Sequence, residues 1–78
     1  SNQDNKPRKP SYKEKTEFEA LDGEVQSLET LKKEILDKMN SGVCGPDELE
    51  KLSRDYQETE SALEEKTNRW LELSELFE

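Results

Sequence analysis

Histidine is absent from this 78-residue sequence, and cysteine occurs once, as Cys44. The lack of histidine removes the commonest general base and metal ligand of proteins. With a single cysteine, zinc sites built from Cys and His are excluded in practice, and an intramolecular disulfide cannot form. The composition therefore gives no support for catalysis by paired Cys and His residues, and it fits a reducing compartment.

Hydrophobic residues are also scarce: they make up 28% of the sequence, and the mean hydropathy is -1.24. No apolar run is long enough to cross a membrane and no segment is typical of a signal peptide, so we expect no membrane partner. Because the sequence starts with Ser1 rather than Met, we expect it to be a piece of a longer protein. A chain this polar folds only if its apolar residues are concentrated in one stripe.

Charge is plentiful but unevenly distributed. Charged residues make up 41% of the sequence, and the net charge is -8. Residues 1–15 contain five basic and two acidic side chains and carry +3, whereas residues 16–78 contain seven basic and eighteen acidic side chains and carry -11. We call the first segment the basic arm; its basic residues are Lys6, Arg8, Lys9, Lys13 and Lys15. We call residues 16–78 the acidic body. A proposed function should account for this charge difference between the basic arm and the acidic body.

A helix-capping motif marks the start of the folded part. Residues 1–10 contain no apolar side chain other than two prolines and are predicted to form a flexible linker. In the next four residues, the Ser11 hydroxyl can accept a hydrogen bond from the Glu14 amide, while the Glu14 carboxylate can reach back to the Ser11 amide. A helix is therefore predicted to start at Ser11.

Apolar residues then alternate at spacings of three and four, which is typical of a coiled-coil seam. In the first arm, residues 11–40, the seam consists of Phe18, Leu21, Val25, Leu28, Lys32, Ile35 and Met39. In the second arm, residues 46–77, it consists of Leu49, Leu52, Tyr56, Thr59, Leu63, Lys66, Trp70, Leu73 and Phe77. Glycine is unfavourable inside a helix and Asp22 could cap a new one, so a bend or short break is expected at residues 22–23.

A turn over residues 41–45 joins the two arms. Gly42 suits the left-handed position after a helix end, and Pro46 suits the first turn of the next helix. Arms of similar length joined by a short loop pack antiparallel. The predicted fold is an all-α, antiparallel coiled-coil hairpin over residues 11–78, with a disordered basic tail.

The hairpin also predicts which seam residues face each other. Lys32 is expected opposite Tyr56, and Phe18 opposite Trp70. The aromatic residues are thereby gathered at the open end of the hairpin, and Tyr12 is expected near them. The alternative for Tyr12 is a partly exposed position, because it lies beside the basic arm. Such a cluster would hold the two termini together.

Several side chains have both a functional and a structural interpretation. Trp70 could stack on a nucleic-acid base, but its seam position favours the core. Cys44 has no His or second Cys to activate it, which favours an incidental loop thiol. Adjacent acids such as Glu64 and Glu65 are more typical of a solvated surface than of an acid–base pair. The basic arm is the best functional candidate, because clustered cations contact phosphates; the alternative is a solubilising linker.

Two motifs at opposite ends of the chain resemble a known module. They are Lys9-Pro10-Ser11-Tyr12-Lys13-Glu14 and Arg69-Trp70-Leu71-Glu72-Leu73. With a Pro-x-Glu-Leu segment after the turn, they resemble the C-terminal coiled-coil domain of ABC-F ATPases of the Uup-like branch, over essentially the whole chain. The residues assigned to the structural motif are Ser11, Tyr12, Glu14, Phe18, Arg69, Trp70, Leu71 and Leu73.

The resemblance implies a soluble parent protein with two ATP-binding cassettes. ATP and Mg²⁺ would bind to those cassettes, so this fragment is expected to be non-catalytic and to hold no cofactor or metal. The C-terminal domain of this branch is associated with DNA binding, and the parents act at the ribosome or on nucleic acids. The resemblance places the protein in the cytoplasm, or in an organelle stroma if the parent carries a transit peptide.

The sequence thus predicts a monomeric domain that contacts the DNA or RNA backbone without distinguishing sequence. The predicted contact residues are Lys6, Arg8, Lys9, Lys13 and Lys15. The main alternative is a protein-interaction module that docks on the ribosome or on the parent's own cassettes through its acidic face. A further alternative is an ordinary self-associating coiled coil.

Overall fold

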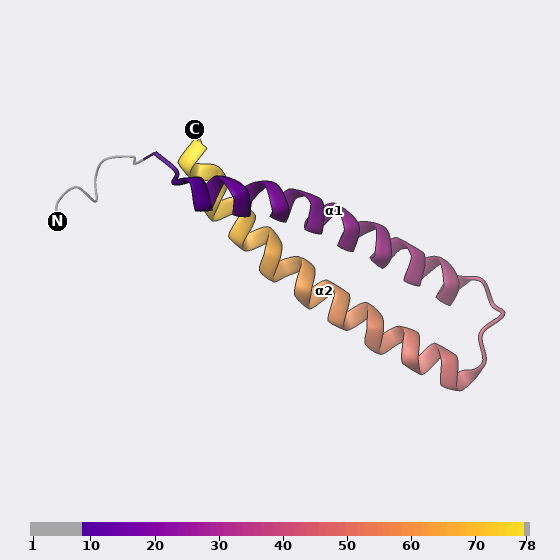
Figure 1. Cartoon of the computed structure of the whole chain (residues 1–78). Helices are drawn as coiled ribbons and strands as arrows, with labels where there is room; N and C mark the ends of the chain where they lie inside the picture. Colours follow the sequence, from indigo (N-terminus) through magenta and orange to yellow (C-terminus); the bar gives the residue numbers. More distant parts are fainter. Residues whose placement is uncertain (1–8, 78) are drawn as a thin grey trace.

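Two long helices account for most of the folded chain. The computed structural model describes residues 9–77. Helix α1 spans Tyr12–Asn40, helix α2 spans Pro46–Ser74, and the short 3-10 helix η2 spans Glu75–Phe77. The start of α1 and the end of the chain lie at the same end of the molecule (Figure 1). The predicted all-α hairpin is therefore confirmed; residues 1–8 of the predicted tail lie outside the described residues.

Both ends of α1 and the start of α2 form where the sequence predicts them. Ser11 Oγ accepts from the Glu14 amide at 3.1 Å, and the Ser11 amide donates to Glu14 Oε1 at 2.9 Å, which completes the capping box. Gly42 has a φ of 79°, a left-handed conformation that glycine adopts without strain. Pro46 occupies the first turn of α2, where its missing N–H costs nothing.

Of the bend or short break expected at residues 22–23, the break does not occur, because α1 continues through both residues. The Asp22 carboxylate accepts from Gln26 Nε2 at 3.3 Å within the same helix and caps no new one. Leu21 is buried and Val25 is half-buried, so packing on α2 holds the helix on both sides of Gly23. That packing outweighs the cost of about 1 kcal/mol for an internal glycine.

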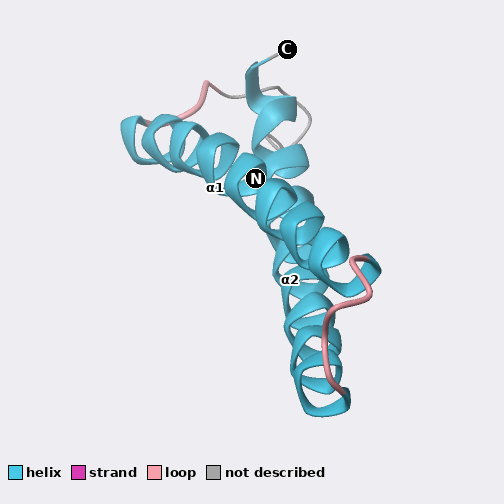
Figure 2. Ribbon diagram, turned by 90° about the vertical axis from the view of Figure 1, so that its right-hand side faces the viewer, coloured by secondary structure: helices cyan, strands magenta, loops and turns pink. Residues whose placement is uncertain are grey.

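The core is a narrow line of side chains between the two helices, which cross at an angle in the view of Figure 2. Within residues 9–77, all five buried residues are predicted seam residues: Leu21, Ile35, Leu52, Thr59 and Leu73. Leu73 is the most deeply buried, with 1% of its surface exposed. The hydroxyl of Thr59 donates to the Asp55 carbonyl at 2.7 Å, so this buried polar group is satisfied within its own helix.

The second arm departs from its prediction near its end. The α-helical part stops at Ser74, and the chain tightens into η2 instead of continuing as α-helix to Phe77. Ser74 Oγ donates to the Leu71 carbonyl at 2.8 Å at this point. The Phe77 ring then lies over Phe18, with 4.7 Å between the ring centroids.

Of the two positions predicted for Tyr12, the exposed one is found: its side chain is 85% exposed and does not join the aromatic cluster. Extending the seam backward from Phe18 in steps of four and three residues leads to Glu14 and Ser11. Tyr12 lies between these positions in sequence and, at 3.6 residues per turn, falls on the opposite side of α1. Tyr12 therefore lies close to the aromatic cluster along the chain but on a face of α1 that points away from α2.

Candidate functional site

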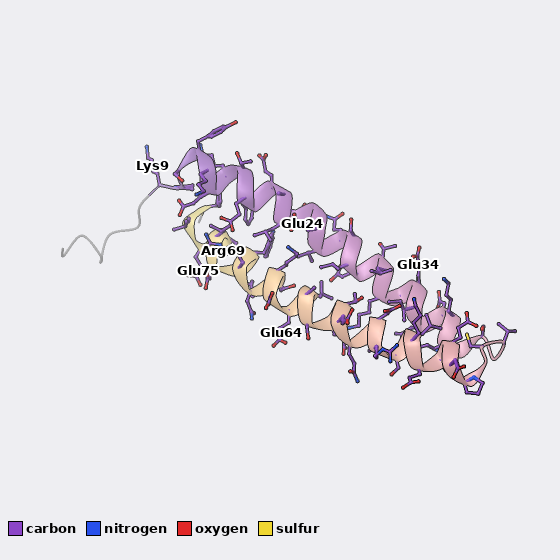
Figure 3. The ribbon with its side chains drawn as sticks, turned by 60° about the horizontal axis from the view of Figure 1, so that its bottom comes forward. Lys9, Glu24, Glu34, Glu64, Arg69 and Glu75 are labelled. Carbon is purple, nitrogen blue, oxygen red and sulfur yellow. The ribbon has the colours of Figure 1, made fainter. Side chains whose placement is uncertain are left out.

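The open end of the hairpin, made of residues 9–19 and 66–77, contains most of the residues singled out in the sequence. Figure 3 shows Lys9, Arg69 and Glu75 at this end, Glu24 and Glu64 in the middle, and Glu34 toward the loop. The capping box orders the first turn of α1, and the seam packs that turn's helix onto the last turns of α2. Side chains of both motifs are thereby brought to one place.

Three lysines of the basic arm lie within the described part of the chain. Lys9 precedes α1, and Lys13 and Lys15 belong to its beginning. All three are exposed, and none forms a salt bridge with another residue of the 9–77 segment. The two remaining predicted contact residues, Lys6 and Arg8, lie outside the described residues.

Two lysines of the acidic body, Lys66 and Lys32, are instead paired across the two helices. Lys66 Nζ lies 2.8 Å from Glu24 Oε1, and Lys32 Nζ lies 3.4 Å from Glu60 Oε2. The hydrogen bond to Glu24 raises the pKa of Lys66. Lys32 Nζ also lies 5.6 Å from the centroid of the Tyr56 ring, so the predicted Lys32–Tyr56 pair is confirmed.

The basic residues nearer the loop divide into two kinds. On α2, Lys51 pairs with Asp55 at 3.3 Å, and Arg54 lies 3.9 Å from Glu50. On α1, Lys33 and Lys38 are exposed and form no salt bridge within the described residues. Unpaired lysines therefore occur at both ends of α1, but only those at the open end continue a basic arm.

The guanidinium group of Arg69 is hydrogen-bonded to two carboxylates. Its Nε and Nη2 donate to Glu17 at 2.8 and 3.0 Å, and its Nη1 donates to Glu72 at 3.0 Å. The hydrogen bond from Arg69 lowers the pKa of Glu17, and these bonds raise the pKa of Arg69. Arg69 thus joins α2 to α1. The motif at the end of the chain identifies Arg69 but not its partner, because Glu17 is one of many acids beside the seam.

An aromatic cluster closes the open end. The rings of Phe18 and Trp70 stack with centroids 5.3 Å apart and an interplanar angle of 19°, and Phe77 lies on Phe18. The predicted Phe18–Trp70 pair is confirmed, and Trp70 is half-buried between the two helices. Trp70 Nε1 is buried and has no hydrogen-bond partner among the described residues. Leu71, from the same motif, is 49% exposed and does not belong to the core.

The middle of the hairpin carries an acidic band. No basic residue occurs between Lys15 and Lys32, or between Arg54 and Lys66. Apart from Glu17 and Glu19, which belong to the open end, the acids of these two segments are Asp22, Glu24, Glu29, Asp55, Glu58, Glu60, Glu64 and Glu65. Because the helices run antiparallel, the two segments lie beside each other. A polyanion is repelled from this band and can approach more easily at an end.

We also considered metal sites, the single thiol and the adjacent acids among the described residues. Across residues 9–77, no group of three His, Cys, Asp or Glu side chains could hold a metal ion. Cys44 is half-buried in the loop, where its Sγ lies 3.3 Å from the Lys38 carbonyl oxygen. Glu64 and Glu65 are exposed, in keeping with the solvated surface predicted for them.

The hairpin and its end motifs have a counterpart in a known family. A family model described as the ABC transporter C-terminal domain matches residues 9–75. The chain belongs to this family. The match includes the capping box, both helices and the Arg69–Trp70 segment, so recognition of a C-terminal domain of an ABC-type protein is confirmed.

For this ABC transporter C-terminal domain, comparison with curated proteins and with solved structures returned no match. Within residues 9–77, no helix is both long enough and apolar enough to cross a membrane. The family assignment and the geometry of the open end are thus the two findings on which a function can be argued.

Proposed function

We propose that this ABC transporter C-terminal domain belongs to an ABC-F ATPase of the Uup-like branch and binds nucleic acid. The basic arm contacts phosphates of DNA, or of ribosomal RNA, without distinguishing sequence. The domain itself is non-catalytic, and ATP and Mg²⁺ bind to cassettes elsewhere in the parent protein. The parent acts in the cytoplasm or in an organelle stroma.

The observation that carries this proposal is the pairing state of the lysines. Lys9, Lys13 and Lys15 are exposed at one end and form no salt bridge within residues 9–77. A lysine already paired with a carboxylate has to break that pair to bind phosphate, whereas an unpaired lysine only releases the counterions of the phosphate. The open end is therefore the part of the described surface best suited to a polyanion.

The acidic band adds an orientation to this contact. Eight carboxylates lie in the middle of the hairpin, and the five that form no salt bridge within the described residues repel a phosphate backbone that approaches along the rod. Binding through the open end leaves this band and the loop pointing away from the nucleic acid. The hairpin then acts as a spacer attached to the nucleic acid at one end.

Fluorescence anisotropy with a labelled duplex at several salt concentrations tests the proposal. Replacing Lys13 and Lys15 by Gln should weaken binding and reduce the salt dependence, by about 0.9 in the slope of log K against log salt for each lost phosphate contact. The matched control replaces Lys33 and Lys38 by Gln, which removes the same charge from unpaired lysines at the other end of α1. This control should leave the slope unchanged. Equal effects of the two variants, or no binding at low salt, would contradict the proposal.

A second candidate function is supported by the acidic band itself. Glu58, Glu64 and Glu65 are exposed and could dock on a basic surface of a ribosomal protein or of the parent's cassettes. Co-sedimentation with ribosomes tests this alternative. If it is correct, Glu58→Lys together with Glu65→Lys should abolish co-sedimentation while the Lys13→Gln, Lys15→Gln variant retains it.

A further inference from the structure

Tyr12 is the most exposed large apolar side chain in residues 9–77, with 85% of its surface accessible. Scattered apolar residues on a surface are common and need no explanation by themselves. Tyr12 differs from such residues in its neighbours along the chain. Lys9, Lys13 and Lys15 are exposed and form no salt bridge within residues 9–77. An aromatic face next to phosphate-binding cations is the combination that proteins use to bind single-stranded nucleic acid.

Helix geometry places the lysines on both sides of the tyrosine. Successive residues of an α-helix are separated by about 100° around its axis. Lys13 therefore lies about 100° from Tyr12 in one direction, and Lys15 lies about 60° from it in the other. Lys9 precedes this turn in the chain. The buried seam residue Leu21, nine residues further on, lies on the far side of α1, so α2 does not cover the tyrosine.

The backbone that carries Tyr12 is well ordered by hydrogen bonds. The capping box joins Ser11 to Glu14 through two bonds, and the Lys15 amide donates to the Ser11 carbonyl at 2.9 Å. Thr16 Oγ1 donates to the carbonyl of Tyr12 itself at 3.0 Å. A ring on such a turn loses little conformational entropy when it contacts a ligand, which favours binding.

We propose that Tyr12 stacks on an unpaired base while Lys13 and Lys15 contact the phosphates on either side of that nucleotide. In an intact duplex the faces of the bases are covered by their neighbours, so the ring gains a contact only where a base is unpaired. The domain therefore prefers single strands over duplex. This inference rests on the proposed function and adds a preference among nucleic acids to it.

Anisotropy with a labelled single-stranded deoxythymidine 12-mer and a blunt duplex of similar length tests the preference. Tyr12→Ala should weaken binding to the single strand about five-fold or more and change binding to the duplex less than two-fold. Tyr12→Phe keeps a ring and should retain most of the affinity. Val43→Ala is the matched control, because Val43 is 83% exposed in the loop; it should change neither affinity.

A second variant gives a direct signal of stacking. In a chain that carries both Trp70→Phe and Tyr12→Trp, the only tryptophan lies at position 12. Its fluorescence should be quenched by the single strand at saturation and much less by the duplex. Circular dichroism of Tyr12→Ala should match the original chain, because the deleted ring packs on nothing in the core.

The outcomes separate this inference from the proposed function. If the original chain binds neither oligonucleotide at low salt, both are overturned. If it binds both with the expected salt dependence and Tyr12→Ala affects neither, phosphate contact stands and the stacking proposal is overturned. Loss of ribosome co-sedimentation in Tyr12→Ala without any loss of oligonucleotide affinity would also overturn it, because the ring would then contact a protein.

Discussion

Arg69 of α2 binds Glu17 of α1 through two hydrogen bonds, from Nε to Oε2 at 2.8 Å and from Nη2 to Oε1 at 3.0 Å. The pair lies beside the stacked rings of Phe18 and Trp70. A charged contact and an aromatic contact thus fix the same level of the hairpin, and a one-turn slip of α2 would break both. The register of the end that carries the basic arm is set by these four residues.

Replacing Glu17 by Gln should lower the Tm at neutral pH, and the loss should disappear in acid. The bond from Arg69 lowers the pKa of Glu17 in the folded protein. A carboxyl whose pKa is lowered by folding contributes stability above its unfolded pKa, about 4.3 for glutamate, and loses that contribution as the pH falls through the folded pKa. The Tm difference between the two proteins should therefore be present at pH 7 and close below pH 4, as followed by thermal circular dichroism.

The control for this experiment is Glu19→Gln. Glu19 is exposed and has no salt bridge among the described residues, so this variant changes the net charge equally without removing a pair. Its Tm should stay close to that of the original chain at neutral pH. If the two variants gave the same Tm at every pH, the overall charge would explain the effect and the Arg69–Glu17 pair would not contribute.

Phe18→Ala should be the most damaging single truncation at the open end. Phe18 contacts both Trp70 and Phe77, so its loss leaves two rings without a partner. Because Phe18 is only half-buried, we expect a cost of about 2 kcal/mol, below the 3–5 kcal/mol of a fully buried ring. This corresponds to a Tm lower by roughly 10 °C. Leu71→Ala is the control; this exposed side chain should cost less than about 0.5 kcal/mol, and equal losses would contradict the packing described.

Gly23→Ala should stabilise the domain by about 0.5–1 kcal/mol. Gly23 lies inside α1, where alanine is favoured by roughly that amount, and an added Cβ would meet nothing within 4 Å. Gly42→Ala should have the opposite sign, because Gly42 has a φ of 79° and alanine is strained there. Chemical denaturation of both variants measures the difference. A destabilising Gly23→Ala would argue for a break in α1 at this position.

The sequence was sufficient to predict the hairpin because its determinants are local and periodic. The capping box at Ser11, the glycine at position 42 and the three–four spacing each specify one feature, and all agree. Two features were less predictable. The break expected at Gly23 rests on a local preference, which packing on both sides of it overrides. The register of the hairpin gives the level of Tyr12 along the rod but not the angle around α1, which leaves its side chain exposed.

The candidate site was predictable only in part. The excess of lysine in the basic arm is visible in the sequence, but the pairing of each cation is not. Lys66 and Lys15 look alike in sequence; Lys66 is bound to Glu24 across the helices, whereas Lys15 has no such partner in the described part of the chain. With so many acids near the seam, the choice of partner depends on side-chain geometry that spacing alone does not determine.

The domain should sediment as a monomer of 9.1 kDa under reducing conditions. Leu31, Leu36 and Leu49, each 37–43% exposed, are the apolar side chains from which a dimer of this coiled coil would be built. They offer far less area than the roughly 800 Å² per partner of a stable interface, and the net charge of -8 opposes association. Without reductant, Cys44 should slowly form a covalent dimer that Cys44→Ser abolishes. A mass that rises with concentration despite reductant would instead support a self-associating coiled coil, in which the exposed leucines of two chains pack together.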